Sequence, residues 1–531
     1  MSIAWRRMEL RVSPACKVAL RRPSGCSLFA LIQSAIILSG CVPSSEMPDL
    51  MMGIPATYRQ DGPGERKNLP PDEWWRDFRS SELNGFMSEV PTGNFDVAAA
   101  IARIVQADAA AHIAGTALLP TMTANDTVTR SKFANLNNTN VNSVTSNASN
   151  TARTVIVTNL QASYILDLWG MNRAKLQAAE ETSNYNRWER DVVALTAYGT
   201  TGTTYLAVLG ARDRINNQND NLKAASRILK LIQDRVKFGT ANALNLAQQE
   251  ALVANIRAAI PPLQLTGDQN LVALGLLVGR VPESIVIKGN SLHDVTMPKI
   301  APGLPSEVLT QRPDVQAAEA QLASAHASVV AARAAFFPQI QLTGEGGFQS
   351  LALKTLFQPS AGLYSLAAGL TQPIFDAGLL QGDYDQAKAR QEELLADYRK
   401  SIVSAFTDVE KALISIRNLR RQEVLLGESL AASQRALDLA EDQLRAGTVD
   451  YTTVLQAQQT LFTTRDTLSQ TRLALLQAGV ALYQALGGGW PQSQAPAQNS
   501  QRDGRGMEKK AAEHETKTAQ AEPRETVGAK P

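Results

Sequence analysis

The chain has 531 residues, of which 44% are hydrophobic, 19% charged and only 5% aromatic, and its formal net charge is +2. So small a charge gives no electrostatic attraction to nucleic acid, which we therefore exclude as a partner. All three cysteines lie within the first 41 residues and the four histidines are widely scattered, so the sequence predicts no metal site, no cofactor and no disulfide in the body of the chain.

The first predicted element is a processing signal over residues 1–40. An apolar run over 27–39 is too short to span a bilayer as a helix and is typical of a secretory signal. It ends in Leu38-Ser39-Gly40-Cys41, which looks like a bacterial lipobox, so we predict that Cys41 begins the mature chain and carries the lipid, palmitate included. Val42 follows, without the aspartate that often retains lipoproteins in the inner membrane, and this favours the outer membrane. A plain signal peptide with a chance cysteine is the alternative.

The remainder of the chain consists of two similar halves. Asp96-Val97 and Asp314-Val315 each open an alanine-rich segment that ends at a proline, and both the openings and the prolines, Pro120 and Pro338, are 218 positions apart. Further along, Gly239 matches Gly447 at an offset of 208. Constant offsets are the signature of internal repeats. We therefore predict a signal peptide over 1–40, a lipidated N-terminal segment and equatorial region over 41–92, a first repeat over 93–290, a second repeat over 306–489 and a disordered tail over 490–531.

Each repeat is predicted to contain a helix, a strand, a loop, a strand, a long helix, a turn and a second helix. Proline is absent between Pro120 and Pro261 and between Pro373 and Pro491, and windows without proline can hold long helices. Alternation of apolar with small or polar residues predicts strands at 121–131, 156–166, 339–350 and 364–371, with exposed loops at 135–150 and 349–359. Long coiled-coil-like helices are predicted at 170–236 and 378–444, followed after a glycine turn by helices at 243–278 and 451–486.

Four strands per chain cannot close a barrel, because about eight are needed to fill even a packed interior. No run of 18 apolar residues follows the signal, so we expect no transmembrane helix, and any span must be a closed barrel. Open strand edges are forbidden energetically in lipid. The predicted fold class is thus mainly α with a β-barrel part, and three copies would supply twelve strands and a pore.

Several short motifs follow one another between Trp74 and Gly489. They are Trp74-Trp75 with Phe78 and Leu83, Leu309-Thr-Gln-Arg312-Pro313-Asp314-Val315 with Ala318-Glu319, Phe336-Phe337-Pro338, Ile374-Phe375-Asp376, Arg445-Ala-Gly447 and Ala457-Gln458. In this order and spacing they resemble the TolC/OprM-type outer-membrane efflux proteins, specifically the lipoprotein (NodT-like) branch. Arg312-Pro313-Asp314 also has a local explanation, because proline and an acid suit a first helical turn.

The resemblance implies a homotrimer with a twelve-stranded barrel in the outer membrane and a twelve-helix tunnel in the periplasm. The implied partners are a periplasmic adaptor (membrane fusion) protein, an inner-membrane transporter of the RND type and outer-membrane lipid. The implied function is a passive export duct for drugs or other toxic small solutes. No G-x-S-x-G, Walker A or HExxH motif occurs, so we predict no catalytic residue and no enzyme activity.

The resemblance also implies that the turns at Gly239-Thr240 and Gly447-Thr448 form the periplasmic tip, where they would line the entrance and contact the adaptor. Simple helix capping is the alternative for both glycines. TolC-like tips carry aspartates six and nine residues after the second glycine, where this sequence has Thr453 and Gln456. Asp450 is the nearest acid, so an entrance gate formed by Asp450, Thr453 and Gln456 is a hypothesis.

Two other functions stay open at this point. The outer channel of a type I protein-secretion system uses the same architecture, although the lipobox and the Arg312-Pro313-Asp314 motif favour solute efflux. A periplasmic coiled-coil scaffold anchored by lipid would explain the helices, but it gives no role to the two alternating strand pairs. The identity of the exported solute is not encoded in any of these motifs.

Overall fold

The computed structural model describes residues 71, 73–132, 152–298 and 305–488. The predicted signal, the lipidated Cys41, the loop at 135–150 and the C-terminal tail lie outside the described residues. By their contacts, the described residues form two compact units. A sheet unit comprises 112–178 and 326–389, and a helical unit comprises most of the remainder.

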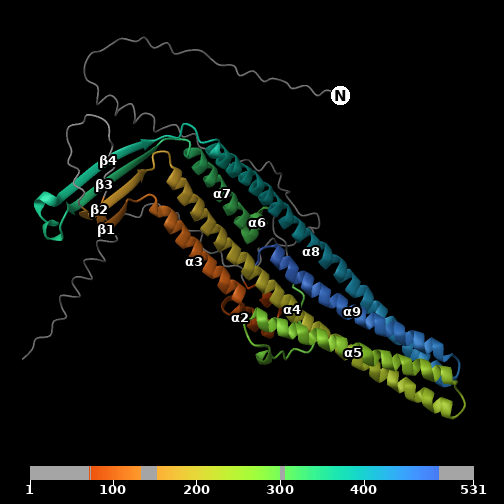
Figure 1. The fold of residues 1–531 in the computed structure, drawn as a ribbon. Helices are drawn as coiled ribbons and strands as arrows, with labels where there is room; N and C mark the ends of the chain where they lie inside the picture. Colours follow the sequence, from red (N-terminus) through yellow and green to blue (C-terminus); the bar gives the residue numbers. More distant parts are fainter. Residues whose placement is uncertain (1–70, 72, 133–151, 299–304, 489–531) are drawn as a thin grey trace, which may run out of the picture. The chain divides into compact units, whose positions relative to one another are not determined.

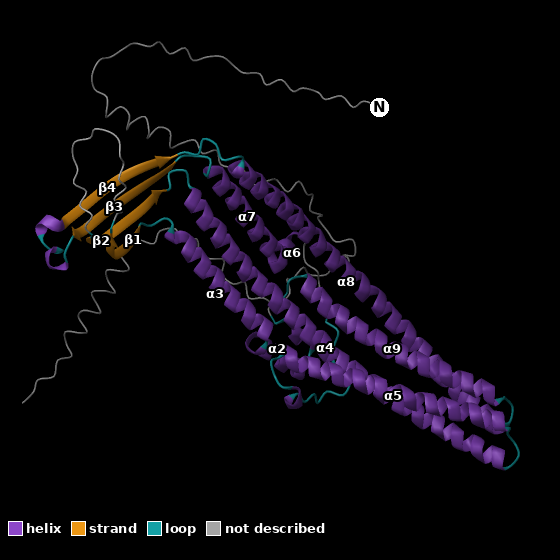
Figure 2. Cartoon of the chain, viewed as in Figure 1, coloured by secondary structure: helices purple, strands orange, loops and turns teal. Residues whose placement is uncertain are grey.

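The sheet unit contains four antiparallel strands in the order β1-β2-β3-β4 (Figures 1 and 2). The strands span Thr121–Ser131 (β1), Arg153–Leu166 (β2), Gln339–Ser350 (β3) and Gly362–Thr371 (β4). Each begins and ends within three residues of its predicted position. Their lengths of 11, 14, 12 and 10 residues suit a membrane-crossing strand, which needs about 9–11 residues.

The register gives this sheet one apolar and one polar face. Leu160 lies opposite Ala124 on β1 and Gly346 on β3, and Tyr164 lies opposite Leu342. We call the side that these even-numbered residues share the apolar face, and the side of the odd-numbered residues the polar face. The apolar face includes Met122, Val128, Ile156, Leu160, Tyr164, Ile340, Leu342, Tyr364, Leu366 and Leu370. Several of these side chains are strongly exposed, Tyr364 at 88% and Leu366 at 84%.

The connection between β3 and β4 is largely exposed, as predicted for the loop at 349–359, although residues 349 and 350 still belong to β3. It folds into two short 3₁₀ turns, η5 at Leu353–Thr355 and η6 at Pro359–Ala361. Leu356 is buried between them, and the rings of Phe348 and Phe357 meet edge to face at 5.6 Å. Leu356 is thus a buried apolar residue of this connection, whereas Leu353 and Phe357 stay 70% and 69% exposed.

The helices repeat with the offsets found in the sequence. Helix α7 (Pro313–Ala334) begins and ends 218 residues after α3 (Phe95–Thr116), and α9 (Tyr451–Ala485) begins and ends 208 residues after α5 (Ala243–Leu277). The two long helices are α4 (Met171–Lys237) and α8 (Leu379–Ala446), of 67 and 68 residues. The remaining helices are α2 (Ser81–Gly93) and α6 (Pro305–Gln311). The predicted tandem repeat and the long helices are confirmed.

Aromatic residues near the start of the described chain form the largest core. The short helix η2 (Trp74–Phe78) buries Trp74 and Phe78 completely. Trp74 stacks on Tyr483 of α9 with ring centroids 4.9 Å apart, and Trp75 stacks on Tyr198 of α4 at 4.8 Å. The Trp74-Trp75 motif is therefore a packing element that holds the N-terminal segment against helices of both repeats.

Two described helical stretches, 81–116 and 171–237, are long and apolar enough to cross a membrane by length and composition alone. The sequence predicted no such helix. In the second stretch, 56% of the apolar window is buried within the protein. The first is interrupted at Asn94, whose side-chain oxygen accepts hydrogen bonds from the backbone N–H groups of Asp96 and Val97 and so caps α3.

Two glycines allow the α2–α3 junction to touch the end of α5. Gly279 follows α5 with φ of +70°, in the left-handed region that favours glycine. A Cβ atom at this position would lie 1.9 Å from the carbonyl oxygen of Gly93. A Cβ atom at Gly93 would in turn lie 2.1 Å from the carbonyl oxygen of Val278. The two backbones can approach this closely only because both residues lack a side chain.

We predict that Gly279→Ala destabilises the helical unit by about 1–3 kcal/mol, because it combines backbone strain with a steric clash. Gly427→Ala is the matched control. Gly427 lies inside α8 with open space around its α-carbon, so alanine there is expected to be neutral or to stabilise by up to about 1 kcal/mol. Thermal unfolding followed by circular dichroism compares the two, and equal midpoints would contradict the prediction.

Candidate functional site

Two matching turns join the long helices to their partners. Gly239 follows α4 with φ of +71°, and Gly447 follows α8 with φ of +77°. The backbone N–H of Gly239 donates to the carbonyl of Val236, and that of Gly447 donates to Leu444. Nothing lies within 4 Å of a Cβ atom built on either glycine, so backbone conformation and not crowding selects glycine here.

The threonine after each glycine completes the cap. The backbone N–H and the hydroxyl of Thr240 both donate to the carbonyl oxygen of Arg235, at 2.8 and 3.0 Å. Thr448 repeats this arrangement on the carbonyl of Gln443, at 3.0 and 3.1 Å. Each turn therefore satisfies helix-end carbonyls with its own residues, so that its exposed surface has a fixed shape.

The residues predicted to form an entrance gate lie close together, since the backbone N–H of Thr453 donates to the carbonyl of Asp450 at 3.1 Å. Thr453 and Gln456 are exposed and together line a groove of about 520 Å³ between α8 and α9, whose other walls include Ser433 and Thr460. Asp450 is also exposed, but it does not line this groove. It is the residue before α9, and its carboxylate makes no capping hydrogen bond. The groove is thus lined by small and neutral polar side chains.

A hydrogen bond links the two helical hairpins close to their turns. The hydroxyl of Tyr451 donates to Gln249 Oε1 at 2.7 Å, and Gln249 Nε2 donates to the carbonyl of Ala225 at 2.8 Å. Tyr451 and Gln249 are both buried, and burial raises the pKa of Tyr451 to about 12. These residues belong to a core shared by α4, α5, α8 and α9. The bond therefore fixes the turn of one repeat against the helix of the other.

Gln458, in the Ala457-Gln458 motif, is fully buried in the same region. Neither its side-chain oxygen nor its side-chain nitrogen has a partner within the described chain. The Ala457-Gln458 motif therefore places an amide side chain inside the helical core.

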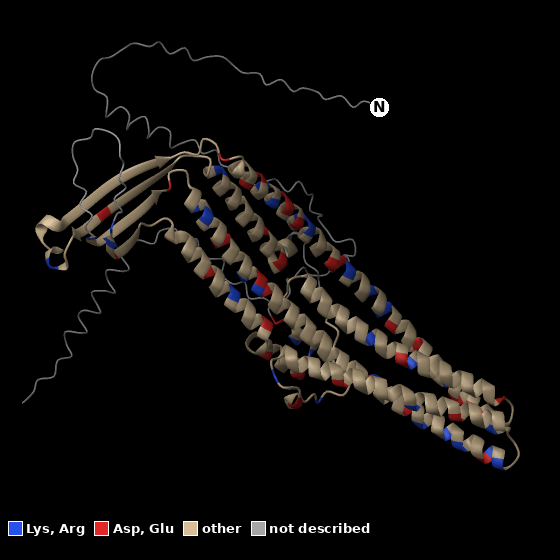
Figure 3. Ribbon diagram, viewed as in Figure 1, with Lys and Arg blue, Asp and Glu red and all other residues tan. Residues whose placement is uncertain are grey.

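A row of basic side chains on α4 was not recognised from the sequence. Lys223, Arg227, Lys230 and Lys237 recur at intervals of four, three and seven residues, which places them on one helix face. All four are exposed, and Figure 3 shows basic residues along the last turns of α4. Asp234 interrupts the row once, and Lys223 pairs with Asp220 of the preceding turn at 3.1 Å. We call these four residues the basic stripe.

The second repeat lacks this charge. The positions 208 residues later on α8 hold Ala431, Arg435, Asp438 and Arg445, and Asp442 stands where α4 has Asp234. Arg445 pairs with Asp442 at 2.9 Å, so this face is neutral overall. A comparison of the two copies at the known offset would have found the difference from the sequence.

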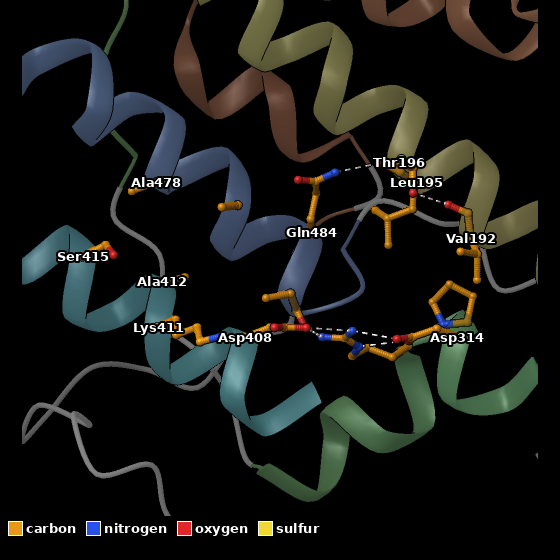
Figure 4. Close-up of a pocket in the computed structure, with 14 residues that line it drawn as sticks. Val192, Leu195, Thr196, Asp314, Asp408, Lys411, Ala412, Ser415, Ala478 and Gln484 are labelled. Carbon is orange, nitrogen blue, oxygen red and sulfur yellow. Dashed lines mark hydrogen bonds and ion pairs between the residues drawn. The ribbon is translucent and has the colours of Figure 1, made fainter. Parts of the chain in front are cut away.

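The Arg312-Pro313-Asp314 motif forms a buried ionic junction. Arg312 Nη2 lies 2.7 Å from Asp314 Oδ2 and 3.2 Å from Asp408 Oδ2, and Nη1 donates to the carbonyl of Ala485 at 3.1 Å. The junction joins the start of α7 to α8 and to the last turn of α9. It borders a cavity of about 460 Å³, at which Figure 4 shows Asp314 and Asp408 with Gln484 and Thr196. The predicted structural role of the motif agrees with these contacts.

The described residues contain no group of three or more histidine, aspartate or glutamate side chains placed to hold a metal ion. The charged groups at the turns and at the Arg312 junction are paired with each other or directed to solvent.

Comparison with known proteins identifies one family. The family described as "Outer membrane efflux protein" matches residues 87–280 and 304–488, well over half of the chain. The match falls in two segments, one in each repeat.

Curated relatives and solved structures agree with that match. The pyoverdine export outer membrane protein OpmQ of Pseudomonas aeruginosa is 36% identical, over 87% of this chain and 97% of the relative. The cation efflux system protein CusC of Escherichia coli O6:H1 is 29% identical, over 86% of this chain and 98% of the relative. The solved outer-membrane channel OprN has the same fold, with a TM-score of 0.78 and 24% identity over 84% of this chain and 99% of that chain.

We predict that Tyr451→Phe destabilises the helical unit by about 1 kcal/mol at neutral pH, because Gln249 loses its donor. The raised pKa of Tyr451 adds a pH dependence. Its contribution is fully present below about pH 10, where an unfolded tyrosine titrates, and it is lost as the pH rises through about 12. Urea unfolding at pH 7 and between pH 10 and 12 measures both effects. Tyr364→Phe, at an exposed position of the sheet, is the control and should leave the midpoint unchanged.

Proposed function

The chain belongs to the outer membrane efflux protein family, and we propose that three copies of it close into a single export duct. Membership makes it an outer-membrane efflux channel and not an enzyme, as the sequence predicted. The alternative of a periplasmic scaffold is wrong. The alternative of a protein-secretion channel finds no support among the relatives, whose names describe the export of pyoverdine and of cations.

The sheet supports the proposed trimer. Strands β1 and β4 each have a neighbour on one side only, so the four described strands leave two open edges. Open edges cannot face hydrocarbon, and a four-stranded sheet cannot close on itself. Pairing β1 of one copy with β4 of the next gives twelve strands in a closed ring. The apolar face then meets lipid and the polar face lines the lumen.

The helical hairpins support a duct that continues into the periplasm. Each copy contributes the pairs α4–α5 and α8–α9, so a trimer has twelve helices around its axis. In this proposal the turns at Gly239-Thr240 and Gly447-Thr448 form the periplasmic tip. Asp450, Thr453 and Gln456 lie beside the second turn and act at the entrance, where three neutral grooves alternate with three carboxylates.

The basic stripe supports a proposed contact with the periplasmic adaptor. Four exposed cations on one helix face attract an acidic partner and orient its approach. The adaptor in turn joins the channel to an inner-membrane transporter of the RND type, which supplies the energy. Because the equivalent α8 face is neutral, an adaptor helix with an acidic face would distinguish the two hairpins of each copy.

The relatives include exporters of different cargo, pyoverdine for OpmQ and cations for CusC. Such a range is what a passive duct allows, since selection of cargo then belongs mainly to the inner-membrane partner. We propose drugs or other toxic small solutes as the cargo of this channel.

The test of this function separates the pore from its partner contact. The purified protein should form cross-linkable trimers and pores in a planar bilayer. The double variant Arg227→Glu/Lys230→Glu should keep the pores but lose solute export in cells, measured as a rise in dye accumulation toward the level of cells that lack the channel. Arg435→Glu, at the position matching Arg227 on the neutral face, should keep both. A wild-type protein that forms no trimer would contradict the proposed trimeric duct. A double variant that still exports would contradict the proposed adaptor contact.

We also propose that lipid on Cys41 anchors the chain in the outer membrane. A single acyl chain binds membranes only marginally, and several chains on one cysteine bind stably. Cys41→Ser should therefore abolish incorporation of radiolabelled palmitate and lower the amount of protein in outer-membrane fractions. Cys26→Ser, within the signal, is the control and should label normally. Labelling that survives Cys41→Ser would refute this assignment.

A further inference from the structure

The polar face of the sheet carries very little charge. Its strand residues are mostly threonine, serine, asparagine, glutamine and glycine. The two charged side chains on this face of the described strands are Arg153, the first residue of β2, and Glu345 in the middle of β3. Glu345 lies opposite Gln161, eight residues along β2 from Arg153, which is about 26 Å at 3.3 Å per residue. That distance exceeds the Debye length in physiological salt, so Arg153 does not neutralise Glu345.

The neighbours of Glu345 are neutral. Gln161 of β2 and Ser365 of β4 lie directly opposite, and Thr343 precedes it on the same face. Its carboxylate accepts a hydrogen bond from the side-chain N–H of Asn159. No lysine or arginine within the described residues pairs with it. Within the described residues, Glu345 therefore stands on the polar face with neutral side chains as its strand neighbours.

The backbone is shaped to allow this hydrogen bond. Asn159 lies diagonally from Glu345, because its direct partner on β3 is Gly347. A Cβ atom at Gly347 would lie 2.6 Å from the α-carbon of Asn159 and 2.2 Å from the carbonyl oxygen of Thr158. With no side chain at 347, the asparagine can lean along the sheet and reach Glu345. The position of the carboxylate is thus built into the strand pairing.

We propose that Glu345 makes the lumen of the barrel selective for cationic over anionic solutes. This inference rests on the proposed trimer with the polar face inside. Threefold symmetry places the three Glu345 carboxylates at one level of the lumen. Rings of acidic side chains select cations in channels, because low-dielectric walls focus their field on the axis. The selective site is therefore inside the barrel, separate from the neutral groove at Thr453 and Gln456.

Reversal potentials in a potassium chloride gradient across a planar bilayer test this proposal. Glu345→Gln should lower the cation-to-anion permeability ratio about two- to fourfold in dilute salt, and the difference should vanish near 1 M, where the Debye length is about 3 Å. Asp126→Asn is the matched control. It removes the same charge from the same sheet but from the apolar face, opposite Thr158, so the ratio should not change.

A rescue variant separates the charge from the fold. Gln161→Glu combined with Glu345→Gln moves the carboxylate to the opposite residue on the same face and should restore the wild-type ratio. Pores of Glu345→Gln that keep the wild-type ratio in dilute salt would overturn the proposal while leaving the channel itself intact. Failure of the wild-type protein to form pores would instead contradict the trimeric channel, and with it this proposal.

Discussion

The unpaired backbone edges of β1 and β4 are the constraint on which the rest of this protein depends. In water, exposed N–H and C=O groups are satisfied by solvent, but in hydrocarbon each unsatisfied group costs several kcal/mol. The apolar face with its exposed Tyr364 and Leu366 suits lipid. A single copy cannot place this face in lipid, because the edges of β1 and β4 would then lie unpaired in hydrocarbon. In the proposed trimer, the lumen, the ring of Glu345 carboxylates and the duct of paired helices all exist only because three copies close these edges.

The two repeats share a backbone plan but not their surface chemistry. The six described glycines with positive φ form three pairs 208 residues apart, at 170 and 378, 239 and 447, and 279 and 487. Against this shared frame, the basic stripe occurs on α4 alone, and Pro261-Pro262 interrupts the hydrogen bonding of α5 but not that of α9. The repeat thus gives each copy two hairpins with similar backbones. Their surface charges differ, so a partner protein can distinguish one hairpin from the other.

Positions of the elements could be predicted closely because their signals are local. Left-handed glycines mark helix ends, the absence of proline permits long helices, and alternation marks strands. The predicted helix at 451–486 and the observed α9 at Tyr451–Ala485 differ by one residue. The exposed loop after β3 was predicted, but its two short 3₁₀ turns were not, since they accompany the burial of Leu356. The basic stripe was missed although it was readable, because the two copies were compared for their similarities and not for their differences.

The sequence by itself determined the repeats, the helix and strand positions, the two capped turns and the need for more than one copy. These follow from backbone sterics and from side-chain periodicity, which act over a few residues. Only the tertiary structure decided which polar groups meet across the repeats. It paired Tyr451 with Gln249, joined Arg312 to Asp408, placed Thr453 and Gln456 in a groove without Asp450, and set Asn159 against Glu345. Those contacts join residues far apart in the chain, and their geometry comes from helix packing and strand register, which no local pattern encodes.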